Sequence, residues 1–233
     1  KWCKPDYNSV VATFCYNVSN NLSIKVKDSS SELSLLYIDD VVEEFVKIIQ
    51  RKQVNKKEIS IQPEYKIKLG DLATQIELFK ESRKSLISER VGVGFVRKLY
   101  STYISYLPPK QFSYSIPSYG DDRGMFAEIL KTKDSGQFSF FIAKQGVTRG
   151  GHYHHTKTEK FLVVQGEARF NFRHIISNET YEINTSGNKL KIIQTVPGWS
   201  HDITNIGVED VIVMLWANEI LDRENIDTVT HKV

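Results

Sequence analysis

The sequence predicts an α-rich first part followed by an antiparallel β sandwich or barrel. Apolar residues recur at helical spacing through roughly the first hundred residues of the chain, and with a period of two after Pro117. The stretch 107–118 carries three prolines and separates the two patterns. We therefore expect one domain over 1–107 and a second over 118–233.

Amphipathic helices account for most of the first part. They are expected at 39–50, 70–82 and 93–106. In the first of these, Val42 and Phe45 lie on one apolar face, and Asp39 or Asp40 can cap the start of the helix. The third ends before Pro108, because proline lacks the N–H that a helix interior needs.

Short strands account for the second part. They are expected at 126–130, 137–143, 159–165, 167–173, 180–184, 189–196, 201–206 and 210–217. In 167–173, Ala168, Phe170 and Phe172 alternate with polar residues, so one face is buried and the other meets solvent. Parallel strands would need crossover helices between them, so this many short strands in sequence favour an antiparallel arrangement.

The composition narrows the class of protein. The net charge is only +3, and the densest basic stretch, 51–57, is short, so nucleic acid is not an expected partner. Two cysteines cannot form a disulfide framework, which favours a reducing compartment such as the cytoplasm. The chain shows neither a secretory leader nor an apolar run long enough to span a membrane.

The beginning of the chain is unusual. It starts at Lys1 and not at methionine, and residues 1–18 show neither a strand nor a capping residue ahead of them. We therefore expect this sequence to be the later part of a longer protein.

Three histidines and one glutamate near the starts of the expected strands could serve as metal ligands. In an extended segment His152 and His154 face the same side, and Glu159 can return to that side on the next strand. A fourth ligand is expected from His201, which follows a Pro–Gly turn. Such a nitrogen and oxygen donor set suits zinc, iron, manganese or nickel. His174 and His231 lack such neighbours and are interpreted as structural.

The spacing of these residues resembles the two motifs of the cupin family. The first motif is matched at Gly146, His152, His154, Glu159 and Gly166, and the second at Gly198, His201 and Asn205. One departure is that Pro197 directly precedes the glycine. The resemblance implies a mainly β cupin jelly-roll barrel in the C-terminal part of the chain.

Two further stretches are similar to the RmlC-type nucleotide-sugar epimerases. The segment 121–129, "DDRGMFAEI", carries their acidic, arginine and glycine pattern, and "TRGGHY" at 148–153 is similar to the segment that bears their catalytic base. The resemblance implies that His152 is the base. It also implies that Arg123 and Arg149 meet the diphosphate of the substrate, with Glu128 among the substrate-binding residues.

The first part resembles the substrate-side portion of an extended short-chain dehydrogenase/reductase (SDR). The resemblance lies in residues 1–17 and in "LLYIDDVVEEF" at 35–45. This part of the chain, residues 1–107, shows neither a glycine-rich dinucleotide loop after a strand nor a Tyr-x3-Lys pair. We therefore interpret it as an α-rich partial SDR domain that lacks its dinucleotide-binding half. This chain alone is therefore not expected to bind NADPH.

An SDR part joined to an RmlC-like cupin resembles the CapF family of bifunctional capsular polysaccharide synthesis enzymes. The resemblance implies that the cupin domain carries zinc and epimerises C3 of a UDP-linked 4-keto-6-deoxy-N-acetylhexosamine. The complete SDR domain would then reduce the C4 ketone with NADPH to give UDP-N-acetyl-6-deoxy-L-talosamine, on the route to UDP-N-acetyl-L-fucosamine. A homodimer through the cupin domain is also implied.

Several assignments stay open at this point. The cupin motif makes His152 a metal ligand, whereas the epimerase pattern makes it a free base. Candidates for the acid that returns the proton are Tyr153, His155 and Lys160. Two other functions remain: an iron-dependent cupin dioxygenase, which leaves 121–129 unexplained, and a non-catalytic dimerisation module braced by zinc.

Overall fold

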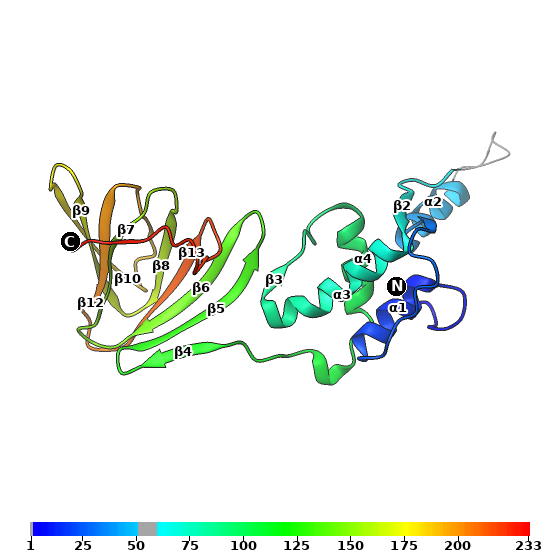
Figure 1. Ribbon diagram of the computed structural model, residues 1–233, viewed down its shortest axis with the longest axis horizontal. Helices are drawn as coiled ribbons and strands as arrows, with labels where there is room; N and C mark the ends of the chain where they lie inside the picture. Colours follow the sequence, from blue (N-terminus) through cyan, green and yellow to red (C-terminus); the bar gives the residue numbers. More distant parts are fainter. Residues whose placement is uncertain (1, 51–59) are drawn as a thin grey trace. The chain divides into compact units, whose positions relative to one another are not determined.

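The computed structural model describes residues 2–50 and 60–233, so the basic stretch at 51–57 lies outside the described residues (Figure 1). The chain packs as two units. The first comprises the residues up to Ser85 together with Glu89–Tyr114, and the second comprises Leu86–Ser88 and Ser115–Val233. The unit boundary at Tyr114 falls inside the proline-bearing stretch 107–118.

Helices dominate the first unit. Its elements are α1 (Val10–Ser19), β1 (Glu32–Leu35), α2 (Ile38–Gln50), β2 (Tyr65–Lys68), α3 (Leu69–Ser85), α4 (Gly94–Ile104) and the 3-10 helix η1 (Pro109–Gln111). The three helices expected from periodicity correspond to α2, α3 and α4. Their core contains Leu72, Ile76 and Phe79 from α3 and Leu99 from α4.

Helix α1 corrects the expectation that the beginning of the chain carries no cap. Ser9 is its N-cap, and the Ser9 hydroxyl accepts a hydrogen bond from the backbone N–H of Ala12. Phe14, Cys15 and Val18 on this helix enter the core of the unit. Helix α2, in contrast, has no buried residue, so its apolar face is uncovered within the described part of the chain.

The second unit consists of two sheets that enclose one apolar core. One sheet has the order β11-β8-β13-β6-β5-β3, with β4 paired to β5, and the other has the order β10-β9-β12-β7-β14 (Figure 1). The strands are β3 (Ile87–Ser88), β4 (Ser118–Asp121), β5 (Gly124–Thr132), β6 (Gly136–Ala143), β7 (Thr148–Tyr153), β8 (Glu159–Gln165), β9 (Glu167–His174), β10 (Thr180–Ser186), β11 (Ile192–Gln194), β12 (Trp199–Asn205), β13 (Val211–Ala217) and β14 (Val229–Thr230).

The β-rich, cupin-like fold expected from the sequence is confirmed. Strand pairs in this unit are antiparallel, apart from the parallel pairing of β3 with β5. Each strand predicted from alternation corresponds to a strand in the structure. The predicted alternation of 167–173 is observed, because Ala168, Phe170 and Phe172 are all buried in the core between the sheets.

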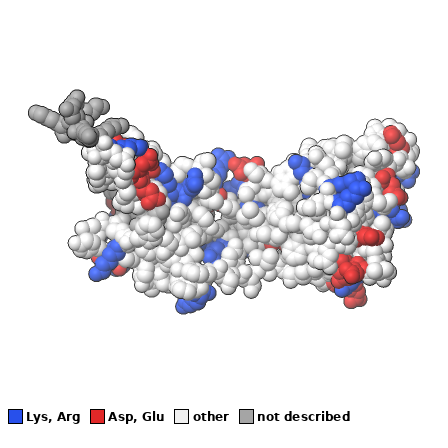
Figure 2. All heavy atoms as spheres, turned by 180° about the vertical axis from the view of Figure 1, so that it is seen from behind, with Lys and Arg blue, Asp and Glu red and all other residues white. Residues whose placement is uncertain are grey.

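The surface carries both signs of charge. On the face shown in Figure 2, basic and acidic residues are interspersed and do not collect into one basic surface. No helix among the described residues is both long and apolar enough to cross a lipid bilayer.

Asn205 ties the end of β12 to two other segments. Its side-chain amide donates to the carbonyls of Ala143, at 2.9 Å, and Glu209, at 2.8 Å, and its oxygen accepts from Gly207 N–H at 2.9 Å. The residue is 1% exposed. Removal of its side chain would leave these buried groups without partners, which is more costly than the loss of an exposed hydrogen bond.

We predict that Asn205→Ala lowers the free energy of unfolding of the second unit by about 2–3 kcal/mol. Denaturant unfolding followed by tryptophan fluorescence measures the change. The matched control is Asn184→Ala, an exposed residue whose amide donates to the Glu182 side chain, and it should change the stability by less than about 0.5 kcal/mol. Equal effects in the two variants would contradict this role for Asn205.

Candidate metal centre

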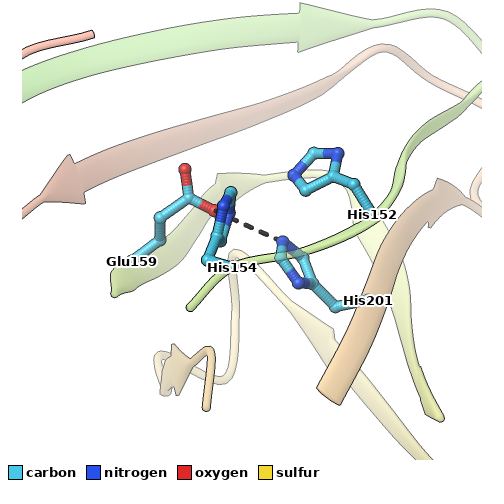
Figure 3. A group of neighbouring side chains, drawn as sticks. All are labelled: His152, His154, Glu159 and His201. Carbon is cyan, nitrogen blue, oxygen red and sulfur yellow. Dashed lines mark hydrogen bonds and ion pairs between the residues drawn. The ribbon is translucent and has the colours of Figure 1, made fainter. Parts of the chain in front are cut away.

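Four side chains from both sheets of the second unit converge on one point (Figure 3). His152 lies in β7, His154 directly follows β7, Glu159 begins β8 and His201 lies in β12. One donor atom from each residue lies within 4.8 Å of the others. The structure therefore brings together all four residues that the sequence spacing indicated as metal ligands.

Strand pairing positions these side chains. His152 is directly opposite His201 across β7 and β12, and their ring centroids are 4.8 Å apart. His154, two residues further along, has its ring centroid 4.9 Å from that of His152. The start of β8 is fixed because the Thr195 hydroxyl accepts a hydrogen bond from Glu159 N–H at 2.8 Å. The convergence thus depends on the register in which these strands pair.

The closest contacts within the group join two imidazole nitrogens to one carboxylate oxygen. His154 Nε2 and His201 Nε2 each lie 3.3 Å from Glu159 Oε2. His154 Nδ1 lies 2.5 Å from the backbone carbonyl oxygen of Asp227, which can only accept, so Nδ1 carries the hydrogen. In neutral His154 the Nε2 lone pair therefore faces a carboxylate oxygen.

Such a buried contact needs a positive charge between the atoms. His154, Glu159 and His201 are 2%, 5% and 3% exposed, so bulk water does not reach their polar atoms. Either a proton on the imidazole or a metal cation satisfies the contact. Three imidazoles and one carboxylate are a donor set that transition metals such as zinc accept, so the residues present fit a metal ion.

The ionisation states favour metal ligation. Burial alone would raise the pKa of Glu159, but hydrogen bonds with His154 and His201 and the charge of Lys157 hold that pKa well below its usual value. Burial, with the neighbouring His201 and His154, lowers the pKa of His152 to about 4. Near neutral pH the carboxylate is therefore ionised and the His152 imidazole has a free lone pair.

Lys157 is a candidate that the sequence analysis missed. Its Nζ lies 3.1 Å from Glu159 Oε1, and its side chain is 13% exposed. The lysine thus neutralises the carboxylate oxygen that does not face the histidines. The one signal in the sequence is a lysine two positions before an acidic ligand, and this is too common to carry a prediction.

The candidate acids lie apart from the four-residue group. The rings of Tyr153 and His155 are 5.4 Å apart, and Tyr153 also lies 6.0 Å from the ring of His231. Alternation along β7 puts Tyr153 on the face opposite His152. Lys160 extends over the ring of Trp216, at 5.3 Å. None of these three candidates contacts the cluster among the described interactions.

A bulge in β7 places Arg149 on the same side as His152. The register between β7 and β12 shifts at this point, and Gly150 and Gly151 have φ angles of +104° and +78°. The Arg149 guanidinium lies 5.2 Å from the ring centroid of Phe141, which is buried in the core. Its Nε is buried and has no hydrogen-bond partner in the described part of the chain.

Arg123 and Glu128, the other predicted substrate-binding residues, each form an ion pair within the second unit. Arg123 forms an exposed salt bridge with Asp121 at the turn between β4 and β5, with a closest N···O distance of 2.5 Å. Burial lowers the pKa of Arg149, and the positive charge of Arg123 lowers it further, so the two guanidinium groups interact. Glu128 accepts a hydrogen bond from Lys131 at 2.9 Å.

His174 and Asn205 are structural, as their surroundings show. The His174 ring packs on Trp199, with centroids 5.1 Å apart, and its Nδ1 is 2.9 Å from the Ser177 hydroxyl. Within the described part of the chain, the hydrogen bonds of the Asn205 side chain are the buried ones to backbone groups given above.

Comparison with known proteins places this geometry in a family. Residues 119–229 match the family model described as "Polysaccharide biosynthesis C-terminal domain". A curated relative from Pseudomonas aeruginosa, named UDP-2-acetamido-2,6-beta-L-arabino-hexul-4-ose reductase, is 57% identical over 228 residues. That alignment covers 98% of this chain and 61% of the relative, so the chain spans less than two thirds of that relative's length.

Solved structures agree with this result over the whole chain. The capsular polysaccharide assembling protein CapF from Staphylococcus aureus matches with a TM-score of 0.93 and 42% identity, over 100% of this chain and 63% of that chain. A CapF structure with the inhibitor 3-isopropenyl-tropolone matches with a TM-score of 0.94 and 42% identity, over 100% of this chain and 68% of that chain. The chain therefore belongs to the CapF family of capsular polysaccharide assembling proteins.

Proposed function

We propose that the second unit is a zinc-dependent epimerase domain that acts at C3 of a UDP-linked 4-keto-6-deoxy-N-acetylhexosamine in capsular polysaccharide biosynthesis. The observation that carries the proposal is the group of the partly buried His152 with the buried His154, Glu159 and His201. The name of the curated relative supports the substrate class, because it specifies a UDP-linked acetamido sugar with a ketone at C4.

The chemistry requires a base beside an acidic C–H bond. The C3 proton of such a sugar is acidic because the C4 ketone accepts the electron pair, which gives an enolate. Return of a proton to the opposite face of C3 completes the epimerisation without a change in oxidation state. When bound, zinc supplies a Lewis acid that stabilises negative charge on a carbonyl oxygen.

We assign separate roles within the four-residue group. His154, Glu159 and His201 would hold the metal, since the two imidazole nitrogens lie equally close to one carboxylate oxygen. His152 would be the base, because it is the one partly buried member of the group and a substrate can reach it. Its pKa, lowered to about 4, leaves the imidazole unprotonated near neutral pH. A nitrogen that binds the metal cannot also take a proton, so one residue does not serve both roles through the same atom.

Two arginines support a diphosphate-bearing substrate. Arg149 has a buried N–H without a partner, and Arg123 interacts with it electrostatically. Guanidinium groups bind phosphate oxygens through paired hydrogen bonds, so a diphosphate between them would satisfy both cations. Glu128, the third predicted substrate-binding residue, would contact the sugar. Tyr153, His155 and Lys160 remain candidates for the acid.

The first unit would be the substrate-side part of an SDR domain. In the complete protein, that domain would reduce the C4 ketone with NADPH to UDP-N-acetyl-6-deoxy-L-talosamine, on the route to UDP-N-acetyl-L-fucosamine. The name "reductase" of the longer relative supports this activity. A homodimer through the barrel would be the working assembly, since closed symmetric pairs are the commonest oligomers.

A second function, a zinc site that only braces the barrel, is favoured by one observation. Structural zinc sites are closed four-ligand sites, and three of the four donors here are almost completely buried. The exchange experiment below separates the two functions, because a bracing ion does not support proton exchange.

We expect the purified chain to hold about one transition-metal ion, mainly zinc, when it is prepared without chelators. His201→Ala and Glu159→Gln should each reduce the metal content to near zero, because each removes a donor. Elemental analysis by mass spectrometry is the measurement. The matched control is His174→Ala, which removes a histidine that packs on Trp199, and it should retain the metal. Metal retention in both ligand variants would refute the assigned site.

We expect the metal-loaded chain to exchange the C3 proton of the UDP-4-keto sugar with solvent, measured by NMR in heavy water. His152→Ala should keep the metal and slow the exchange by about 100-fold or more, as expected for loss of a general base. His201→Ala should lose both the metal and the proton exchange, and His174→Ala should keep both. Loss of metal from His152→Ala would make His152 a ligand. Absence of exchange in the folded, metal-loaded wild type would leave only the bracing function.

NADPH should not be oxidised by this chain in the presence of the 4-keto sugar. The reason is that residues 1–107, which resemble an SDR domain, carry neither a glycine-rich dinucleotide loop after a strand nor a Tyr-x3-Lys pair. Absorbance at the nicotinamide band measures the rate. Oxidation that depends on the enzyme concentration would show that the interpretation of the first unit is wrong.

A further inference from the structure

The segment after β13 returns to the metal centre. In Figure 1 it runs back across the barrel strands, and β14 pairs with β7 through Val229 and Thr230. The backbone N–H of Asn218, at its start, donates to the carbonyl of Thr158 at 3.1 Å. The backbone N–H of His231, near its end, donates to the carbonyl of Gly151 at 2.9 Å. Both ends of the segment are therefore anchored beside the residues that carry the ligands.

The Asp227 carboxylate holds the turn that follows His154. It accepts hydrogen bonds from the backbone N–H groups of His155 at 2.9 Å, Thr156 at 2.7 Å and Lys157 at 2.8 Å. The Thr156 hydroxyl donates to it at 2.9 Å. These hydrogen bonds, led by that of the His155 N–H, hold the pKa of Asp227 well below its usual range. The carboxylate is therefore ionised and each of its oxygens is occupied.

The backbone carbonyl of Asp227 fixes the tautomer of His154. This oxygen accepts from His154 Nδ1 at 2.5 Å, and the Thr228 hydroxyl lies 3.3 Å from the same nitrogen. The ring hydrogen is thereby held on Nδ1, and Nε2 faces Glu159 with its lone pair. His201 differs, because its Nδ1 is buried without a partner in the described part of the chain.

We propose that Asp227 is a positioning residue of the metal centre, which fixes the tautomer of His154 through its carbonyl and the turn 155–157 through its carboxylate. Without the carbonyl acceptor, the other tautomer becomes available to His154, with Nε2–H donating to Glu159. That tautomer has no lone pair for a metal at Nε2. The inference rests on the proposed metal-binding role of the cluster.

The carboxylate and the carbonyl act together. The side chain of Asp227 is hydrogen-bonded to the three residues that follow His154, and this holds the carbonyl of the same residue against His154. Lys157, which contacts Glu159 Oε1, is one of them. Loss of the carboxylate would therefore disturb two contacts of the cluster at once. Loss of a residue that hydrogen-bonds to a metal ligand and orients it typically lowers metal affinity by about 10–100-fold.

The test compares Asp227→Ala with Asp222→Ala in the whole chain. Asp222 is an exposed aspartate of the same segment, and its carboxylate accepts from one local N–H, that of Glu224, at 2.9 Å. The first readout is NMR of the ¹⁵N-labelled imidazoles, with and without zinc. In the wild type and Asp222→Ala, His154 should show a slowly exchanging hydrogen on Nδ1 in both states. Asp227→Ala should lose this protection.

The second readout is metal affinity, by chelator competition with zinc, together with the visible spectrum of the cobalt(II)-substituted chain. Asp227→Ala should bind zinc about 10–100-fold more weakly and change the cobalt bands. Asp222→Ala should stay within about twofold of the wild type with an unchanged spectrum. Asp227→Asn, which keeps one carbonyl oxygen in place, should fall between them and replaces Asp227→Ala if that variant does not fold.

The outcomes separate this inference from the proposed function. A zinc affinity within about twofold of the wild type in the Asp227 variants, with unchanged cobalt bands, would overturn the inference while the metal site stands. Failure of the wild type to bind zinc would remove the proposed function. The NMR readout in the metal-free chain then decides the inference, and a His154 ring with its hydrogen only on Nε2 would overturn it.

Discussion

The contact between two imidazole nitrogens and one carboxylate oxygen is the constraint on which the barrel's site depends. His154 Nε2 and His201 Nε2 lie equally close to Glu159 Oε2, and all three side chains are buried. Because the hydrogen of His154 is held on Nδ1, its Nε2 and the Glu159 oxygen are both acceptors, and such a buried contact needs a proton or a metal cation between them. The strands that carry them are held by the apolar core, so the fold supplies the energy that keeps the donors together.

Neighbouring residues supply partners for the remaining polar atoms of Glu159 and His154. Lys157 neutralises the outer oxygen of Glu159, and the segment after β13 occupies the far nitrogen of His154. The bulge at Gly150–Gly151 turns Arg149 to the side of His152, so that a cation and a possible base share one face of β7. This separation of roles suits an enzyme in which one set of residues binds a metal, another moves a proton and a third binds an anion.

The features that were predicted correctly from the sequence are those determined by a local pattern of residues. Alternation identified the strands that form the core, and the spacing of the motifs identified all four residues of the cluster. These patterns missed helix α1, whose cap Ser9 is a single residue in a segment without strong periodicity. They also missed Asp227, because that residue contacts the 154–157 segment only after the chain has passed through the whole barrel. The exposed apolar face of α2 has no explanation within the described residues.

The most direct measurement of the central claim is X-ray absorption at the zinc edge of the metal-loaded chain. The account predicts a nearest shell of nitrogen and oxygen atoms at about 2.0–2.1 Å, with the outer-shell pattern of at least two imidazoles and without sulfur. A shell containing sulfur at about 2.3 Å would assign the ion to a cysteine site. That result, or a spectrum without imidazole, would contradict the view that His154, Glu159 and His201 hold the metal.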